Sequence, residues 1–145
     1  MIRYLLDTNV ISELRKTAPH GAVVAWLETL RVEQIFVSAV TMGELQAGVE
    51  LTRRQNAVKA REIETWLTSV EMSFAFVPMD PACFREWARL MAGKPDVLRE
   101  DAMIGATARV HGFEVATRDE GDFKRLGVRI INPFKVGRNT LANDK

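Results

Sequence analysis

The sequence contains a single cysteine, Cys83, which excludes an internal disulfide. A lone thiol suits a reducing compartment, so we expect a cytoplasmic protein in which Cys83 packs as a small buried hydrophobe. The sequence also lacks an uncharged apolar run long enough to span a membrane. Its first residues lack the apolar region and cleavage site of a secretory signal. We therefore expect no membrane association.

Neither sign of charge is in clear excess, because the formal net charge is only +1. Overall charge therefore gives no indication of nucleic-acid binding. Basic side chains gather only locally, and most of these groups are expected to be solvated helix faces. Arg118 and Lys124 differ because they stand beside acidic residues. Histidine is scarce too, and we predict that His20 and His111 lie on helices away from the acidic motifs, without a catalytic role.

Apolar residues make up 47% of the 145 residues, which is enough for one compact domain with a full core. Strand-like and helix-like periodicities alternate along the chain, which favours an α/β fold with a parallel sheet. We predict a single domain over residues 1–134 and a polar tail over 135–145. The predicted strands cover 2–6, 34–39, 74–78, 113–117 and 128–131, and the predicted helices cover 8–16, 19–30, 41–51, 56–72, 80–91 and 101–111, the third and fourth forming a hairpin.

Acidic residues occupy four places in this pattern, each after a strand or near the start of a helix. Asp7 follows the first strand, and Glu44 lies early in the third helix. Asp101 opens a helix of small residues, while Asp119 and Asp122 follow the fourth strand. Because the carboxyl ends of parallel strands line one edge of a sheet, these side chains are expected to meet there. Gathered carboxylates repel one another at low dielectric, so we predict a bound hard cation, Mg²⁺ or Mn²⁺.

Each acidic residue also has a purely structural explanation. Asp7 and Asp101 can be helix N-caps. Glu44 lies three residues after Thr41, which is the spacing of a capping box. Asx turns can account for the acids of residues 119–122. The metal site is therefore favoured by the ordered set of acids more than by any one of them.

This ordered set resembles the PIN-domain nucleases, and in particular the VapC-like ribonuclease toxins of prokaryotic toxin–antitoxin modules, with FitB-type proteins as the most similar subgroup. Many relatives carry asparagine at the position of Asp119 and aspartate at that of Asp122. The fourth acid is therefore ambiguous, and we favour Asp119 because it is closer to the strand end. Gly105 stands where alanine is more usual. The resemblance covers nearly the whole chain and rests on the segments Leu6–Glu13, Ser38–Leu45, Asp101–Ala108, Thr117–Phe123 and Ile131–Phe134.

The resemblance implies a three-layer α/β/α sandwich with a twisted parallel sheet of about five strands and a protruding helical hairpin. It implies hydrolysis of RNA by a water molecule activated by Mg²⁺ or Mn²⁺, with Asp7 and Asp101 as metal ligands. Glu44 and Asp119 complete the catalytic set. Residues around the metal ligands are implied to support them and to orient the carboxylates by hydrogen bonds; these are Thr8, Asn9, Ser38, Thr117 and Asp122. Arg118 and Lys124 are implied to bind the RNA backbone.

By the same resemblance we expect a small cognate antitoxin as a partner, because a free ribonuclease would harm its own cell, and we expect a homodimer. Residues 45–51 and 63–67 of the hairpin either dock an antitoxin helix or only fill the core. Two other functions stay open. One is a PIN-like module that binds nucleic acid without cleaving it. The other is a phospho-acceptor domain built on Asp7, although such domains typically place a second aspartate where Asn9 stands.

Overall fold

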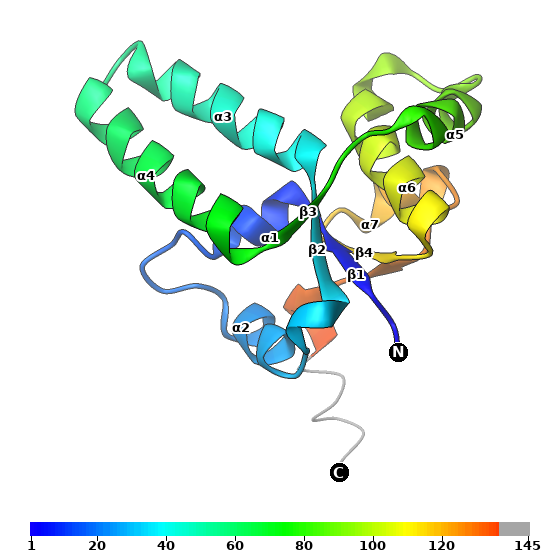
Figure 1. Ribbon diagram of the computed structural model, residues 1–145, viewed down its shortest axis with the longest axis horizontal. Helices are drawn as coiled ribbons and strands as arrows, with labels where there is room; N and C mark the ends of the chain where they lie inside the picture. Colours follow the sequence, from blue (N-terminus) through cyan, green and yellow to red (C-terminus); the bar gives the residue numbers. More distant parts are fainter. Residues whose placement is uncertain (137–145) are drawn as a thin grey trace.

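The computed structural model describes residues 1–136 and contains a five-stranded parallel sheet in the order β3–β2–β1–β4–β5 (Figure 1). The sheet confirms the predicted strands, although each strand is shorter than predicted. The bounds are β1 (Tyr4–Leu6), β2 (Ile35–Ser38), β3 (Ala75–Val77), β4 (Glu114–Ala116) and β5 (Ile130–Ile131).

Helices separate the strands, as the alternating periodicity predicts. In Figure 1 the α3–α4 hairpin extends away from the sheet, while α5 and α6 pack together on the other side. The bounds are α1 (Thr8–Glu13), α2 (Gly21–Glu28), α3 (Ala39–Arg53), α4 (Ala57–Ser73), α5 (Pro81–Met91), α6 (Arg99–His111) and α7 (Glu120–Arg125), with short 3-10 helices η1 (Val32–Gln34) and η2 (Asp96–Leu98).

The central strand shows how the two faces of the sheet are covered. Successive side chains of a strand point to opposite faces. Leu5 packs in an apolar cluster with residues of α5, α6 and α7, whereas Tyr4 and Leu6 pack in a second cluster with residues of α1 and α2. All three side chains are buried, as expected for a parallel strand covered on both faces. The predicted three-layer α/β/α arrangement is confirmed.

The helix starts differ from the predicted ones in two places that matter for the site. α3 begins earlier than predicted, because Ser38 caps it by accepting a hydrogen bond from the amide of Val40 at 3.0 Å. Thr41 is therefore inside the helix and fully buried, and the capping box expected there is absent. α6 begins at Arg99, which places Asp101 in the first turn and not at the N-cap.

Two further segments differ from expectation near the acidic residues. The predicted turn after β4 is the start of α7, and Asp119 is its N-cap. α1 ends at Glu13, short of the predicted residue 16, and α2 is capped by His20, whose ring nitrogen accepts a hydrogen bond from the amide of Ala22 at 3.2 Å. These short helices keep the residues after β1 and β4 close to the sheet edge.

The small residues of α6 let this helix approach its neighbours closely. A β-carbon added at Gly105 would lie 2.9 Å from Cγ2 of Val128, closer than real contacts allow. The predicted end of the helix at Gly112 is confirmed, because that residue adopts φ 72°, a left-handed conformation that suits glycine. α6 is thereby fixed against the sheet with its N-terminal turn at the carboxyl edge.

The start of the predicted tail is attached to the domain. Lys135 forms an ion pair with Glu120 at 2.8 Å, and Val136 packs against the cluster that contains Tyr4 and Leu6. Residues 137–145 of the predicted tail lie outside the described residues. Within residues 1–136, none of the helices has the length and apolar character needed to cross a membrane.

Candidate metal centre

Three carboxylates from two helix starts converge at the carboxyl edge of the sheet. One oxygen each of Asp101, Asp119 and Asp122 lies within 4.8 Å of the others. Asp101 projects from the first turn of α6, while Asp119 caps α7 and Asp122 lies in its first turn. Helix N-termini carry partial positive charge, which favours carboxylates at these places. The structure thus brings together three of the predicted acids, with both Asp119 and Asp122 beside Asp101.

Asp7 lies at the end of β1 and is held by three hydrogen bonds. Its Oδ1 accepts from the amide of Thr8 at 2.8 Å. Its Oδ2 accepts from Oγ1 of Thr117 at 2.7 Å and from Nδ2 of Asn9 at 3.3 Å. Burial raises the pKa of Asp7 above its ordinary value, although the hydrogen bonds from Thr117 and Thr8 act in the opposite direction. The carboxylate is therefore fixed in orientation and largely removed from water.

Glu44 reaches the same region from α3. Its Oε1 accepts a hydrogen bond from Oγ1 of Thr8 at 2.9 Å, and the same hydroxyl lies 3.0 Å from Oγ1 of Thr41. Partial loss of hydration raises the pKa of Glu44, and the charges of Asp7 and Glu100 raise it further. Thr41, expected only as a helix cap, instead supports the hydroxyl that orients Glu44.

A cleft of about 430 Å³ joins these groups. Burial, followed by the charges of the neighbouring acids, raises the pKa of Asp101 from 3.8 to about 7. Such a site holds more carboxylates than it can ionise at neutral pH without a compensating cation. Its donors are all oxygen atoms, which fits Mg²⁺ or Mn²⁺. The cleft is lined by Asp7, Thr8, Asn9, Ser12, Glu13, Lys16, Glu44, Asp101, Arg118 and Asp119.

A hydrogen-bond network ties the ends of β1 and β4 together beneath the cleft. The hydroxyl of Thr117 donates to Asp7 and accepts from the amide of Asp119 at 2.9 Å and from Nδ2 of Asn9 at 3.2 Å. Oδ1 of Asn9 accepts from the amide of Arg118 at 3.2 Å. Ser38, predicted to orient a carboxylate, caps α3 instead. Of the predicted orienting groups, those on α1 and after β4 thus contact the acids.

The two predicted substrate-binding cations are placed differently. The guanidinium of Arg118 lies 3.7 Å from the centroid of the Phe134 ring, and its Nη2 lies 3.7 Å from Oε1 of Glu13. These contacts hold Arg118 at the edge of the cleft that it lines. Lys124 is exposed in the last turn of α7, outside the set of residues that line the cleft.

Glu13 is a residue of the cleft to which the sequence assigned no role. Its side chain is buried and accepts hydrogen bonds from Nζ of Lys16 at 2.9 Å and from the amide of His20 at 3.0 Å. The hydrogen bond from Lys16 lowers the pKa of Glu13 below its ordinary range. The spacing offered a signal, because Asn9 and Glu13 are four residues apart and so share one face of α1.

Comparison with known proteins agrees with this geometry. The model of the PIN domain matches residues 4–128. The VapC ribonuclease Y4jK of Sinorhizobium fredii is 38% identical over 143 residues, which cover 90% of this chain and 97% of that protein. Toxin FitB of Neisseria gonorrhoeae is 36% identical, with 90% and 97% covered. The crystal structure of FitAcB from Neisseria gonorrhoeae matches with a TM-score of 0.81 at 36% identity, covering 92% of this chain and 99% of that one. The chain belongs to the PIN-domain family, in the group that includes VapC and FitB toxins.

Proposed function

We propose that this protein is the ribonuclease toxin of a type II toxin–antitoxin module, and that it hydrolyses RNA phosphodiester bonds. The observation that carries the proposal is the shared cleft of Asp7, Glu44, Asp101 and Asp119. Similar proteins include a VapC ribonuclease and toxin FitB. The phospho-acceptor alternative is not favoured, because the side chain of Asn9 is engaged in orienting Asp7.

The acids of the cleft fit a divalent cation, and we assign Asp7, Asp101 and Asp119 to hold Mg²⁺ or Mn²⁺. When bound, such an ion supplies a positive charge for the phosphate and lowers the pKa of water. The network around Thr117 keeps the carboxylate of Asp7 oriented without a contribution from solvent. Asp122 lies close enough to Asp119 to support it.

We assign proton removal and RNA binding to side chains at the walls of the cleft. Glu44 has a raised pKa and a fixed position through Thr8, so it suits removal of a proton from the attacking water. Arg118 lies at the edge of the cleft with its guanidinium over Phe134, where it can bind an RNA phosphate. We assign Lys124 to a more distant phosphate of the same strand.

A second hollow next to the cleft provides a docking place for the antitoxin. This groove of about 380 Å³ lies between α1, α3 and α4, and shares Thr8, Ser12 and Glu44 with the acidic cleft. Its apolar walls come from Leu45, Val49, Ile63 and Trp66. We propose that an antitoxin helix docks here, because such helices bury an apolar face in grooves of this kind.

Some apolar residues of the hairpin fill the core and others are open to a partner. Val49 and Leu67 are buried, whereas Leu51 is 64% exposed. Toxin–antitoxin complexes among the solved structures support a partner: VapBC-5 of Mycobacterium tuberculosis, described as a member of a toxin–antitoxin family, matches with a TM-score of 0.62 at 25% identity. A homodimer and a cytoplasmic location are part of the same proposal.

The test is an RNA cleavage assay on the purified chain. We expect cleavage that EDTA stops and that Mg²⁺ or Mn²⁺ restores. Asp7→Asn and Asp101→Asn should remove cleavage and growth arrest while leaving the circular dichroism spectrum unchanged. Asp96→Asn is the matched control, because the side chain of Asp96 is 85% exposed just before α6. Cleavage in EDTA would exclude the metal mechanism, and RNA binding without cleavage would identify a binding module.

A further inference from the structure

A second group of metal-ligating side chains lies between α5 and α6, away from the acidic cleft. Asp80 caps α5, Cys83 lies in the first turn of α5, and His111 ends α6. One ligand atom from each lies within 4.8 Å of the other two. Asp101 and His111 are at opposite ends of α6, and a rise of about 1.5 Å per residue separates them by roughly 15 Å. The group is therefore distinct from the acidic cleft.

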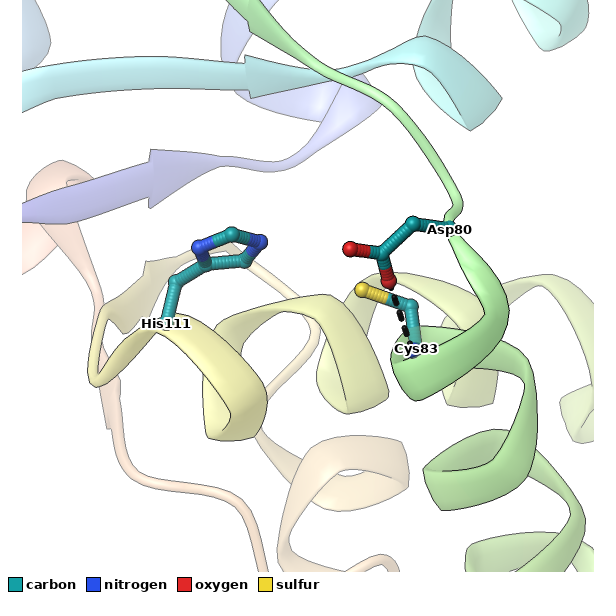
Figure 2. Close-up of side chains that lie close together, drawn as sticks. All are labelled: Asp80, Cys83 and His111. Atoms are coloured by element: carbon teal, nitrogen blue, oxygen red, sulfur yellow. Dashed lines mark hydrogen bonds between the residues drawn. The ribbon is translucent and has the colours of Figure 1, made fainter.

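The three side chains converge on one another. One oxygen of Asp80 accepts a hydrogen bond from the amide of Cys83 at 2.9 Å, which caps α5. Figure 2 shows the other oxygen of Asp80 directed towards the imidazole of His111, and a ring nitrogen of His111 turned towards Asp80 and the sulfur of Cys83. Oxygen, sulfur and nitrogen donors thus face one small space.

The ring of His111 provides an independent reason to expect a ligand. Its Nε2 is buried and has no hydrogen-bond partner within residues 1–136. A buried polar atom without a partner is costly, and native proteins rarely leave one. The ring is also held in place, because Phe113 stacks on it with centroids 5.4 Å apart, and Nη2 of Arg3 donates to the carbonyl of His111 at 2.8 Å. A fixed imidazole with an unused nitrogen is suited to bind a cation.

We propose that Asp80, Cys83 and His111 bind a borderline divalent cation such as Zn²⁺, with water as the fourth ligand. A thiolate, an imidazole and a carboxylate form a donor set typical of Zn²⁺, in contrast to the all-oxygen set of the acidic cleft. Zinc bond lengths place ligand atoms roughly 3.3–3.6 Å apart in a tetrahedral site. Because the ligand atoms already lie within 4.8 Å of one another, the three groups need to approach by at most about 1.5 Å, which rotation of side chains can supply.

Binding exchanges a proton for the metal ion. The sulfur of Cys83 forms a bond to the cation, its S–H bond breaks, and the proton passes to solvent. Burial, followed by the contact with Asp80, raises the pKa of the Cys83 thiol, so the metal-free protein keeps this proton at neutral pH. Cys83 is fully buried, as the sequence predicts. The structure adds His111 as its neighbour, which the sequence does not place near it.

The test uses Co²⁺ as a spectroscopic substitute for Zn²⁺ on the full chain. Because Cys83 is the only cysteine, a thiolate-to-cobalt charge-transfer band can arise only from this site. We expect a band whose final intensity corresponds to one thiolate-bound Co²⁺ per chain and which disappears when Zn²⁺ is added. Loss of a supporting group near a metal already weakens binding about 10- to 100-fold, so His111→Gln and Asp80→Asn should weaken Co²⁺ binding at least tenfold.

The variants are chosen to keep the fold. Asparagine is as good an N-cap as aspartate, so Asp80→Asn preserves the start of α5. Cys83→Ala should remove the band altogether, whereas Asp122→Asn, in the acidic group with Asp101 and Asp119, should leave it unchanged. Absence of the band from folded protein in excess Co²⁺ would overturn the proposal. A band that is equally strong in His111→Gln and Asp80→Asn would overturn it as well.

Discussion

Replacement of Asp101 by asparagine should stabilise the metal-free protein at neutral pH. Burial and the charges of Asp7, Asp119, Asp122 and Glu44 raise the pKa of this carboxyl from 3.8 to about 7. Because the pKa is higher in the folded chain than in the unfolded chain, ionisation of Asp101 favours unfolding. The stability associated with the protonated group is fully present below about pH 4 and is lost as the pH rises to about 7.

The size of the effect follows from this pKa shift. A shift of about three pH units corresponds to about 4 kcal/mol at 1.36 kcal/mol per unit. The cleft is open to solvent and the side chain is only partly buried, so screening reduces this figure. We expect that Asp101→Asn raises the free energy of unfolding by about 1–2 kcal/mol at pH 7 and by almost nothing at pH 4. The melting temperature should rise by about 2–8 °C at pH 7.

Urea unfolding in EDTA between pH 4 and pH 7 measures this difference. Asp96→Asn removes the same charge from an exposed position, and we expect it to stay within about 0.5 kcal/mol of the wild type. Addition of Mg²⁺ or Mn²⁺ should stabilise the wild type more than Asp101→Asn and so reduce the gap. A destabilised Asp101→Asn at pH 7, or a gap independent of pH, would refute the reasoning. The charge of Asp101 would then be balanced within the protein.

Three other comparisons of variants test the acidic site and the packing of α6. Asp119→Asn should reduce RNA cleavage more than Asp122→Asn, because Asp119 lines the cleft; the reverse order in a cleavage assay would make Asp122 the fourth acid. Thr117→Val removes a hydroxyl that lies 2.7 Å from Oδ2 of Asp7, so we expect a loss of about 1–3 kcal/mol in urea unfolding and slower cleavage, with Thr117→Ser close to the wild type. Gly105→Ala should destabilise by about 1–3 kcal/mol through the clash with Val128, but should stabilise by up to about 1 kcal/mol in a Val128→Ala background; equal effects in both backgrounds would exclude the clash.

The order of strands and helices could be predicted because each element has its own local pattern of apolar residues in the sequence. The apolar run before Asp7 indicated a strand buried on both faces, and all three residues of β1 are buried. The start of α3 could not be predicted in the same way. Ser38 and Thr41 are both good N-caps, so local chemistry does not choose between them. With Ser38 as the cap, Thr41 lies inside α3, and its hydroxyl contacts that of Thr8 in α1.

For the acidic site, too, some features could be predicted from the sequence and others could not. Asp7, Asp101 and Asp119 could be predicted to lie at one edge, because each follows a strand or lies at the start of a helix. The side chains that hold the site in place could not be predicted with equal success. The position of Arg118 depends on Phe134 and Glu13, and that of Glu44 depends on Thr8. These contacts arise from packing between elements, which periodicity does not describe.

The two proposed cation sites lie at opposite ends of α6, and each end favours a different kind of ligand. Its N-terminus favours anions, so Asp101 can lie there as a carboxylate, and the proposed metal ion would contact that carboxylate and not the positive end of the helix. Its C-terminus favours positive charge, which would add to the attraction of the proposed ligands beside His111 for a cation. Ligand chemistry then separates the ions, because carboxylates prefer Mg²⁺ or Mn²⁺, whereas a thiolate and an imidazole prefer Zn²⁺. If both sites exist, low concentrations of Zn²⁺ should therefore occupy the site at Cys83 without inhibiting RNA cleavage.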